Sequence, residues 1–314
     1  MTDMNDLNEN IKDPKKAGFA TIIGRPNVGK STLMNRMIGQ KIAITSYKPQ
    51  TTRNQIRTIY TGEEGQIVFL DTPGIHESRT KLGDYMVKAA KGTLKEVDVV
   101  LWLVEPRAKL TEEDKAIIGL LKEVKTPVIV VINKIDKVKK AEILPVIDLY
   151  AHAGEFHEII PVSARTGDGV GLLMEEVFRL LPEGEPFYDE DMVTTQTERE
   201  ISAEIIREKA LRLLQEEVPH GIAVTIETMK TRKRKGKGDI CDIDASIVCE
   251  KETHKRIIIG KDGAMLRRIG TDARKDIENM LQRQVNLKLW VKVRRDWKDD
   301  DTQMRSFGYD ARKL

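Results

Sequence analysis

The chain has 314 residues, which is enough for two domains with separate hydrophobic cores. Hydrophobic residues make up 40% of it, which argues against wholesale disorder, and its few aromatic residues exclude nucleic-acid binding that rests mainly on ring stacking. The net charge of +3 is unevenly distributed along the chain, because residues 198–314 hold 27 Lys and Arg against 21 Asp and Glu. This basic excess favours a polyanionic partner for that part.

The N-terminal segment, residues 1–16, is polar and lacks the apolar stretch of a signal peptide. No apolar run in the chain reaches the length of a membrane span. We therefore expect a soluble, cytoplasmic protein.

Residues 17–183 alternate short apolar runs with amphipathic stretches. The apolar runs predict buried strands at 19–23, 67–70, 99–104, 128–132 and 159–162. The amphipathic stretches predict helices near 31–38, 82–95, 112–122 and 169–181. Buried strands that alternate with helices indicate an α/β domain with a mainly parallel sheet covered on both faces.

A proline- and glycine-containing stretch, Pro182–Pro186, ends this pattern, and we assign residues 184–197 to a linker. Residues 198–295 follow a different, α+β order. This order is a helix (198–216), two strands (223–229 and 240–248), two helices around a glycine pair and a last strand (285–293). Residues 296–314 form a C-terminal tail.

A phosphate-binding motif follows the first predicted strand. Gly24-Arg-Pro-Asn-Val-Gly-Lys30-Ser31 fits G-x-x-x-x-G-K-[ST] and opens the first helix, which is the context that the motif requires. The N–H groups of such a loop and the helix N-terminus surround phosphate oxygens, and Lys30 adds a positive charge. The Ser31 hydroxyl can bind Mg²⁺.

Asp71-Thr-Pro-Gly74 follows the strand at 67–70. A carboxylate at a strand end can hold Mg²⁺ through water, and the Gly74 N–H can meet a γ-phosphate. By itself this sequence is also that of an ordinary turn.

Asn133-Lys-Ile-Asp136 follows the strand at 128–132. Asp136 can accept from both N–H donors of guanine, and adenine would leave that carboxylate unpaired, which is costly. We expect Asn133 to meet the N7 side of the base and the stem of Lys134 to cover its face.

Ser163-Ala164 follows the last strand of this domain, and the Ala164 N–H is predicted to donate to guanine O6. Four motifs in this order, each at a strand end, predict one guanine-nucleotide site. Its expected residues are Gly24, Arg25, Pro26, Asn27, Val28, Gly29, Lys30, Ser31, Thr32, Asp71, Thr72, Pro73, Gly74, Asn133, Lys134, Asp136, Ser163 and Ala164.

From about Gly18 onward the chain resembles the Era family of bacterial ribosome-assembly GTPases. Pro49-Gln-Thr-Thr-Arg53 is similar to the switch I segment of that family. The resemblance implies that Thr52, or else Thr51, joins Ser31 as a protein ligand of Mg²⁺, with Asp71 acting through water. A polar loop that binds no metal is the alternative.

The same resemblance bears on hydrolysis. Ile75 stands where Ras-like proteins place a glutamine that positions water, and an aliphatic side chain cannot do so. No residue is therefore firmly assigned as catalytic, and Lys30, Thr52 and Gly74 are expected to support phosphoryl transfer. Relatives that share this feature often recruit K⁺ through an asparagine at the place of Asn27. Asn27 as an ordinary turn residue stays the alternative.

Ile257–Ile269 predicts a helix, a G-x-x-G turn and a second helix, in the order of a type II KH domain, which the Era family carries here. Glycines in such a turn let a nucleic-acid backbone approach closely. The expected RNA-binding residues are Gly260, Lys261, Asp262, Gly263, Arg267 and Arg268.

Two further segments are left open. The basic run Arg232–Lys237 is either a solvated hairpin tip or a contact to RNA phosphates. Arg294–Trp297 and Phe307–Tyr309 resemble the family's tail, which joins the RNA site, and simple packing against the KH domain is the alternative.

The resemblance implies GTP and GDP as ligands, Mg²⁺ as cofactor, and binding of 16S ribosomal RNA near its 3′ end in biogenesis of the 30S subunit. It leaves open a peripheral contact with the inner face of the cell membrane. The rival hypotheses are another RNA-associated GTPase, such as a tRNA-modification or translation-linked one, and an RNA-binding scaffold with a degenerate nucleotide site. Intact Lys30, Ser31, Asp71 and Asp136 argue against the scaffold.

Overall fold

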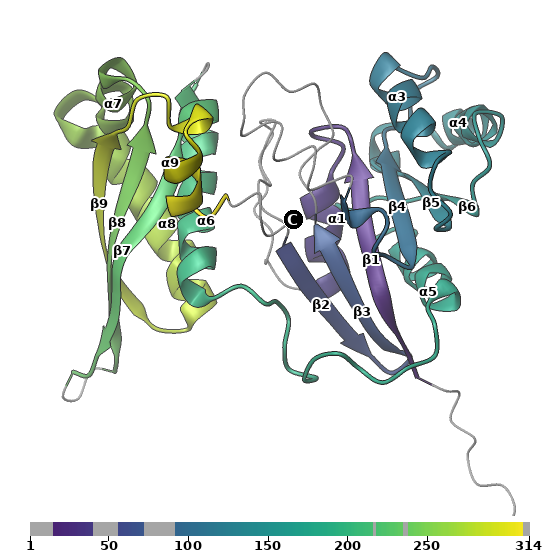
Figure 1. The fold of residues 1–314 in the computed structure, drawn as a ribbon, viewed down its shortest axis with the longest axis horizontal. Coiled ribbons are helices and arrows are strands. Elements are labelled where there is room, and N and C mark those ends of the chain that lie inside the picture. Colours follow the sequence, from purple (N-terminus) through teal and green to yellow (C-terminus); the bar gives the residue numbers. More distant parts are fainter. Residues whose placement is uncertain (1–14, 40–55, 72–91, 216–217, 235–237, 310–314) are drawn as a thin grey trace, which may run out of the picture.

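The computed structural model describes residues 15–39, 56–71, 92–215, 218–234 and 238–309, which form two α/β units (Figure 1). The first unit contains a six-stranded sheet and the second a three-stranded sheet. The segment 184–197 connects them.

The sheet of the first unit has the strand order β2-β3-β1-β4-β5-β6. Its parallel strands are β3 (Gly65–Asp71), β1 (Lys16–Gly24), β4 (Val99–Val104), β5 (Val128–Ile132) and β6 (Glu158–Pro161). At one edge β2 (Ile56–Gly62) runs antiparallel to β3. The prediction of a mainly parallel sheet is confirmed.

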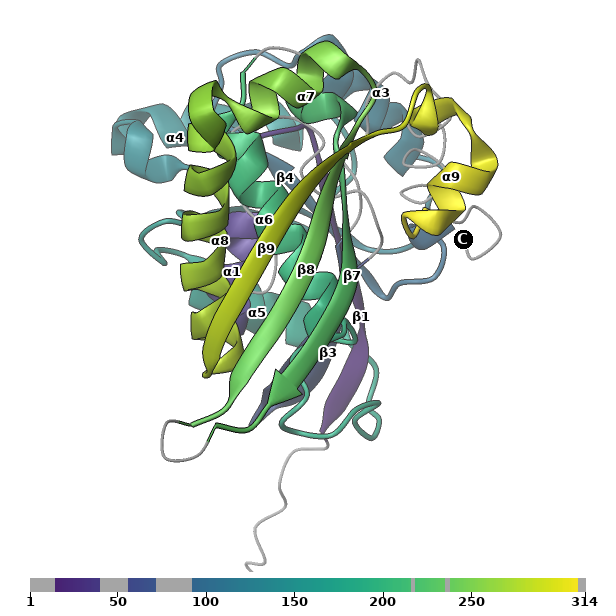
Figure 2. The same ribbon diagram turned by 90° about the vertical axis from the view of Figure 1, so that its left-hand side faces the viewer.

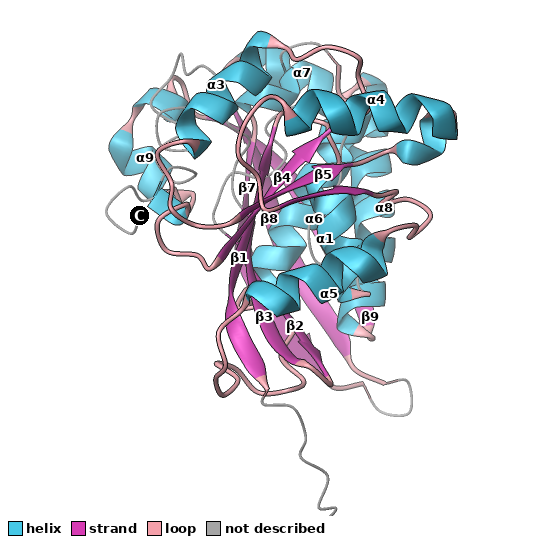
Figure 3. Cartoon of the chain, turned by 90° about the vertical axis from the view of Figure 1, so that its right-hand side faces the viewer, coloured by secondary structure: helices cyan, strands magenta, loops and turns pink. Residues whose placement is uncertain are grey.

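Helices cover both faces of this sheet (Figure 3). α1 (Lys30–Ile38) and α5 (Val170–Leu180) share one hydrophobic core with the sheet. α3 (Glu112–Leu121) and α4 (Lys140–Ala151) share the other. Because helices lie on both sides, β4 and β5 are buried along their whole length.

Two elements of this unit were not predicted. β2 carries only a weak apolar pattern, in which Ile59 is buried and Arg57 is exposed. α4 contains Pro145 and leaves Leu144 71% exposed, so its amphipathic pattern is poor. The helix expected over 82–95 falls largely outside the described residues.

The second unit has the predicted order of helix, two strands, two helices and a strand. These elements are α6 (Glu198–Leu213), β7 (Ala223–Arg232), β8 (Ile240–Cys249), α7 (Glu252–Ile259), α8 (Ala264–Leu281) and β9 (Gln284–Val293). In the sheet β7-β8-β9 the first pair is antiparallel and the second parallel. Figure 2 shows the three helices on one face of this sheet, while the other face is largely open.

The C-terminal segment, which includes α9 (Asp301–Ser306), packs at one end of this open face. Trp297 is fully buried against Ala223 and Val248, and its Nε1–H donates to the Gly221 carbonyl at 3.0 Å. The structure thus shows this segment packed against the second unit, and its expected part in the RNA site stays a prediction. Within the described ranges, no helix has both the length and the apolar character to cross a membrane.

The connecting segment 184–197 is hydrogen-bonded along the β2 side of the first sheet. The buried Gln66 accepts from the N–H groups of Phe187 (2.8 Å) and Tyr188 (3.0 Å) and donates to the Tyr188 carbonyl at 2.9 Å. Further along, the Ile59 N–H donates to the Val193 carbonyl at 2.9 Å. The linker is thus fixed to the first unit by a buried amide and by backbone pairing.

Replacing Gln66 by Leu should release this segment, because a leucine supplies neither the acceptor nor the donor that the linker backbone uses. We expect a loss of about 1–3 kcal/mol in the free energy of unfolding of the first unit, the cost of a broken buried hydrogen-bond set. Urea unfolding measures it. Gln196→Leu is the matched control, since only its backbone is hydrogen-bonded among the described residues; equal losses in the two variants would contradict this role of Gln66.

Candidate functional site

The predicted motifs lie together at one edge of the first sheet. Because β1, β3, β4, β5 and β6 are parallel, their carboxyl ends share an edge, and each of four motifs begins at such an end. Asp71, at the end of β3, pairs in register with Ile22, two residues before the glycine that ends β1. Open α/β sheets bind ligands in the crevice at this edge.

The loop from Gly24 to Lys30 wraps around the Lys30 ammonium group. Lys30 Nζ donates to the carbonyls of Gly24 (2.9 Å) and Arg25 (3.0 Å), and Lys30 opens α1. Asn27 is exposed and has a left-handed backbone (φ 66°). This loop can surround phosphate oxygens with N–H groups at a helix N-terminus, as the motif predicts.

Asn133 lies beneath this loop and is only 2% exposed. Its Nδ2 donates to the Val28 carbonyl at 2.8 Å, and its Oδ1 accepts from the Ala164 N–H at 3.0 Å. A Cβ on Gly29 would lie 2.2 Å from Asn133 Nδ2, so a glycine is required there. The amide of Asn133 thus joins three of the predicted motifs.

These bonds give Asn133 and Ala164 a structural role. Burial explains them, because the Val28 carbonyl and the Ala164 N–H need a partner where water is excluded. The Asn133 amide nitrogen carries a second N–H. The expected contacts of Asn133 with the N7 side of the base and of the Ala164 N–H with O6 stay predictions.

Asp136 is exposed in front of this buried amide. Its Oδ1 accepts from the hydroxyl of Ser163 at 2.7 Å, and the same hydroxyl oxygen accepts from the Thr166 N–H at 3.2 Å. Ser163 is 1% exposed, so this bond orients the carboxylate from its buried side. A fixed, outward-facing acceptor is what recognition of two adjacent N–H donors requires.

A charged network links the loop after β5 to the phosphate loop. Lys134 donates to the Asn27 carbonyl at 2.6 Å and to the carboxylate of Glu105 at 2.5 Å. Burial opposes ionisation of Glu105, but the hydrogen bond and charge of Lys134, together with Arg107, outweigh it and hold the carboxyl pKa below its usual value. The Lys134 ammonium group is therefore held over the phosphate loop.

Arg25 extends this network away from the phosphate side. Its Nε lies 3.0 Å from the buried carboxylate of Asp114, which also forms the capping box of α3 with Thr111. Neither Glu105 nor Asp114 was predicted from the sequence. The available signals were the end of β4 for Glu105 and the T-x-x-D capping pattern for Asp114.

Other predicted residues are placed only in part. Ser31 and Thr32 follow Lys30 in the first turn of α1, with Ser31 half-buried and Thr32 exposed, and Pro26 and Val28 lie within the loop. Of Asp71 only the backbone is described. Thr51, Thr52, Thr72, Pro73, Gly74, Ile75 and residues 235–237 of the basic run lie outside the described residues.

The predicted glycine turn lies between α7 and α8 of the second unit. Gly260 (φ 73°), Asp262 (φ 51°) and Gly263 (φ 74°) all have left-handed backbones, and Lys261 and Asp262 are exposed. A Cβ on Gly260 would lie 2.9 Å from the Met265 nitrogen, whereas one on Gly263 would meet open space. The turn therefore needs glycine at its first position for packing and offers room for a ligand at its last.

A groove of about 350 Å³ runs from this turn between α8 and β9. Its polar lining is Arg267, Thr271 and Arg274, and its remaining lining is Gly263, Leu266, Gly270, Leu287 and Leu289. We call it the α8–β9 groove. Arg267 was predicted, whereas the exposed Arg268 does not line the groove and Arg274 was missed, although the i, i+4, i+7 spacing from Arg267 could have indicated it.

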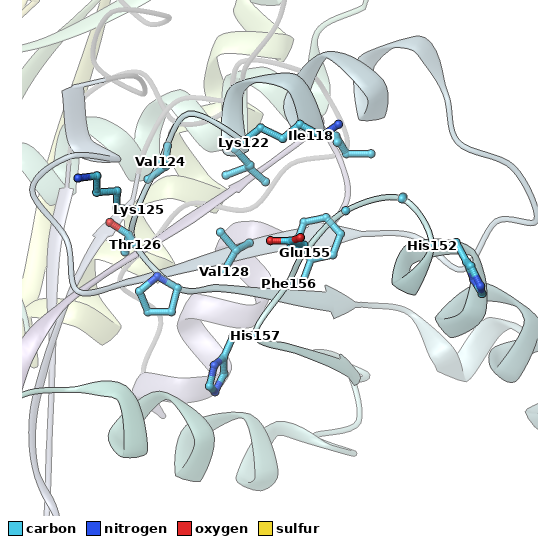
Figure 4. Close-up of a pocket in the computed structure, with 14 residues that line it drawn as sticks. Ile118, Lys122, Val124, Lys125, Thr126, Val128, His152, Glu155, Phe156 and His157 are labelled. Carbon is cyan, nitrogen blue, oxygen red and sulfur yellow. The ribbon is translucent and has the colours of Figure 1, made fainter.

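A larger hollow of about 800 Å³ lies elsewhere, at the amino end of β5 (Figure 4). Its lining combines buried Ile118 and Val128 with exposed Lys122, His152 and His157. Since it lies at the opposite edge of the sheet from the motif residues, it is not the predicted nucleotide site.

Comparisons with known proteins match both units of the chain. The model of the 50S ribosome-binding GTPases matches residues 19–134, and the model of the KH domain matches residues 217–298. The GTPase Era of Alkaliphilus metalliredigens is 52% identical over 295 residues, which cover 94% of this chain and 99% of that protein. The chain belongs to the Era family of GTPases. As a member of it, the protein is a GTP-hydrolysing enzyme.

Other Era proteins show the same extent of similarity. The GTPase Era of Clostridium acetobutylicum is 52% identical over 95% of this chain and 99% of that protein. A crystal structure of Era in complex with MgGDPNP and nucleotides 1506–1542 of 16S ribosomal RNA has a TM-score of 0.90 and 42% identity, covering 94% of this chain and 99% of that one. An Era variant from Aquifex aeolicus bound to GDP and AlF₄⁻ has a TM-score of 0.89 and 43% identity over the same shares. We accordingly call the first unit the G domain and the second the KH domain.

Proposed function

We propose that this GTPase binds 16S ribosomal RNA near its 3′ end through the α8–β9 groove and acts in biogenesis of the 30S subunit. The observation that carries the proposal is the groove itself. It joins a glycine turn open to a phosphate backbone with an apolar floor for bases and with two arginines beside them. Similarity over the whole chain to an Era crystallised with nucleotides 1506–1542 of that RNA supports the choice of ligand.

For the nucleotide we propose that Asp136 reads guanine and that the loop around Lys30 holds the phosphates. The Asp136 carboxylate is exposed and fixed by Ser163, and the Lys134 ammonium group is fixed by Glu105. Asn133 and Ala164 hold these loops in place, and their contacts with the N7 side and O6 of guanine stay predictions. The site residues predicted outside the described ranges, Thr72, Pro73 and Gly74, stay predictions.

The nucleotide site fits Mg²⁺. Ser31 adjoins Lys30 at the start of α1, and the Asp71 backbone ends the strand next to β1, so both residues belong to the phosphate side of the site. Both residue types carry the hard oxygen donors that Mg²⁺ binds. Ser31, with Thr52 and Asp71, would hold the ion, and the ion would neutralise charge on the phosphates. A related Era was crystallised with MgGDPNP.

Three finer expectations stay predictions: K⁺ held by Asn27, a cytoplasmic location, and peripheral contact with the inner face of the cell membrane.

For K⁺ the exposed side chain of Asn27 is the supporting observation. Hydrolysis should then run faster in K⁺ than in Na⁺ at equal ionic strength, and Asn27→Ala should remove the difference. If the variant kept the same ion preference, Asn27 would not bind K⁺ and would be an ordinary turn residue.

Guanine recognition predicts the behaviour of Asp136→Asn. An amide keeps the size of the side chain but replaces one acceptor by a donor, so affinity should shift from GTP towards xanthosine triphosphate, whose carbonyl can accept from it. We expect a loss of at least about tenfold for GTP, or about 1.4 kcal/mol. Competition binding with both nucleotides measures it, and equal GTP affinity in wild type and variant would refute the assignment.

RNA binding predicts the behaviour of a variant with Gly260→Asp and Gly263→Asp. Two carboxylates would repel phosphate at the turn, so affinity for the RNA fragment should fall by at least about tenfold while GTP affinity stays. Because Gly260 is packed against Met265, Gly263→Asp alone is the cleaner variant.

Gly39→Asp is the matched control for that experiment. Gly39 also has a left-handed backbone (φ 75°), and a Cβ added there would meet no atom of the described residues within 4 Å, but it lies in the G domain. Circular dichroism confirms folding of each variant. Wild-type RNA affinity in the folded Gly263→Asp variant would show that the turn is not the RNA site.

A further inference from the structure

Trp290 lies on the open face of the KH sheet and has no part in the function proposed so far. Its side chain is 59% exposed, whereas the other tryptophans of the chain, Trp102 and Trp297, are fully buried. The other outward positions of β9 are polar or charged, at Gln284, Asn286, Lys288 and Lys292. Single exposed apolar residues are common on proteins, so the surroundings of Trp290 decide what its exposure means.

Those surroundings are cationic along the strand. Lys288 and Lys292 stand two residues before and after Trp290, and the two-residue period of a strand places all three on one face. Lys292 pairs with Glu227 at 2.7 Å. Lys288 lies opposite Asp244 of β8 but forms no direct salt bridge among the described residues. Besides the hydrogen bond from Arg232, the Lys288 charge helps to hold the pKa of the Asp242 carboxyl below its usual value.

The carboxylates of this face are already bonded within the sheet. Asp242 accepts from Arg232 and, at 2.7 Å, from Asn286, while Asp244 accepts from Thr228 at 2.9 Å. Across the sheet from Trp290 lies a small residue, Ser246. The ring and the Lys288 ammonium group are therefore the groups of this face most open to a ligand.

Trp290 is also continuous with the α8–β9 groove. The residue before it, Leu289, lines the groove from the inner face of β9, and β9 is the edge strand of the sheet (Figure 2). Successive side chains of a strand point to opposite faces, so a polynucleotide that leaves the groove at Leu289 reaches Trp290 by crossing the edge strand β9.

We propose that Trp290 is a stacking platform for a base of the RNA strand that leaves the α8–β9 groove, with Lys288 contacting an adjoining phosphate. The inference rests on the proposed function, because it concerns the same RNA. A KH turn clamps about four nucleotides, so a longer single strand needs contacts beyond the groove. Stacking on an aromatic ring accepts any base and adds affinity without adding sequence specificity.

Fluorescence tests the contact directly, because Trp290 is the exposed tryptophan. The full chain is titrated with two RNAs: the 1506–1542 fragment of 16S RNA and a tetranucleotide from its single-stranded 3′ end. The long RNA should quench the emission and shield it from acrylamide, a neutral quencher. The tetranucleotide, confined to the groove, should do neither.

Variants give the energetic test. Trp290→Ala should weaken binding of the long RNA by about 5- to 100-fold, the range found for one stacked base, while Trp290→Phe should recover most of the loss. Affinities for the tetranucleotide and for GTP should not change. Lys288→Ala should lower the salt dependence of long-RNA binding by about one charge. Leu144→Ala, at an exposed leucine of the G domain, is the control.

These measurements distinguish a failure of the proposed RNA function from a failure of the Trp290 stacking platform. If wild type binds neither RNA, the proposed RNA function itself is wrong. If wild type binds the long RNA but Trp290→Ala binds it equally well and acrylamide still reaches Trp290, the stacking platform is wrong while the function stands. In that case Trp290 is left exposed in the RNA complex, as a protein-contact residue would be.

Discussion

The buried amide of Asn133 is the interaction on which the nucleotide site depends. It donates to the Val28 carbonyl and accepts from the Ala164 N–H, so one side chain joins the phosphate loop, the loop after β5 and the loop after β6. These loops come from strands far apart in sequence that share an edge only because the sheet is parallel. Removing the amide would leave two buried backbone groups unpaired, at about 1–3 kcal/mol each. The outward groups have holders of their own, since Ser163 fixes Asp136, and Glu105 with the Asn27 carbonyl fixes the Lys134 ammonium group.

The lining of the α8–β9 groove follows from the residue periodicities of a helix and of a strand. Helix periodicity places Arg267, Thr271 and Arg274 on one side of α8, and strand periodicity places Leu287 and Leu289 opposite them. The same strand turns Lys288 and Trp290 outwards. The two domains are joined by a segment that Gln66 and β2 hold against the G domain.

Most of this fold could be predicted from the sequence, and the exceptions have physical causes. Buried strands such as 99–104 and 128–132 were predicted to the residue, because a short unbroken apolar run between turn signals is typical of a strand buried on both faces. The edge strand β2 and the proline-containing α4 were missed because neither buries a continuous face. In the site, motif spacing indicated Asn133 and Ala164 but not that they bond each other, since pairing of buried polar groups depends on tertiary contacts. Glu105, Asp114 and Arg274 were missed although each had a local signal: the end of β4, the capping pattern before α3 and the helical spacing from Arg267.

The most direct test of this account is the nucleotide affinity of Asn133→Asp beside Asn133→Ala. Aspartate keeps the acceptor for Ala164 but cannot donate to the Val28 carbonyl, and alanine loses both bonds. The account predicts that each variant binds GTP at least about tenfold more weakly than wild type, and that RNA affinity of the KH domain is retained. Isothermal titration of GTP, with circular dichroism as a check of folding, measures this. Wild-type GTP affinity in the folded Asn133→Ala variant would contradict it.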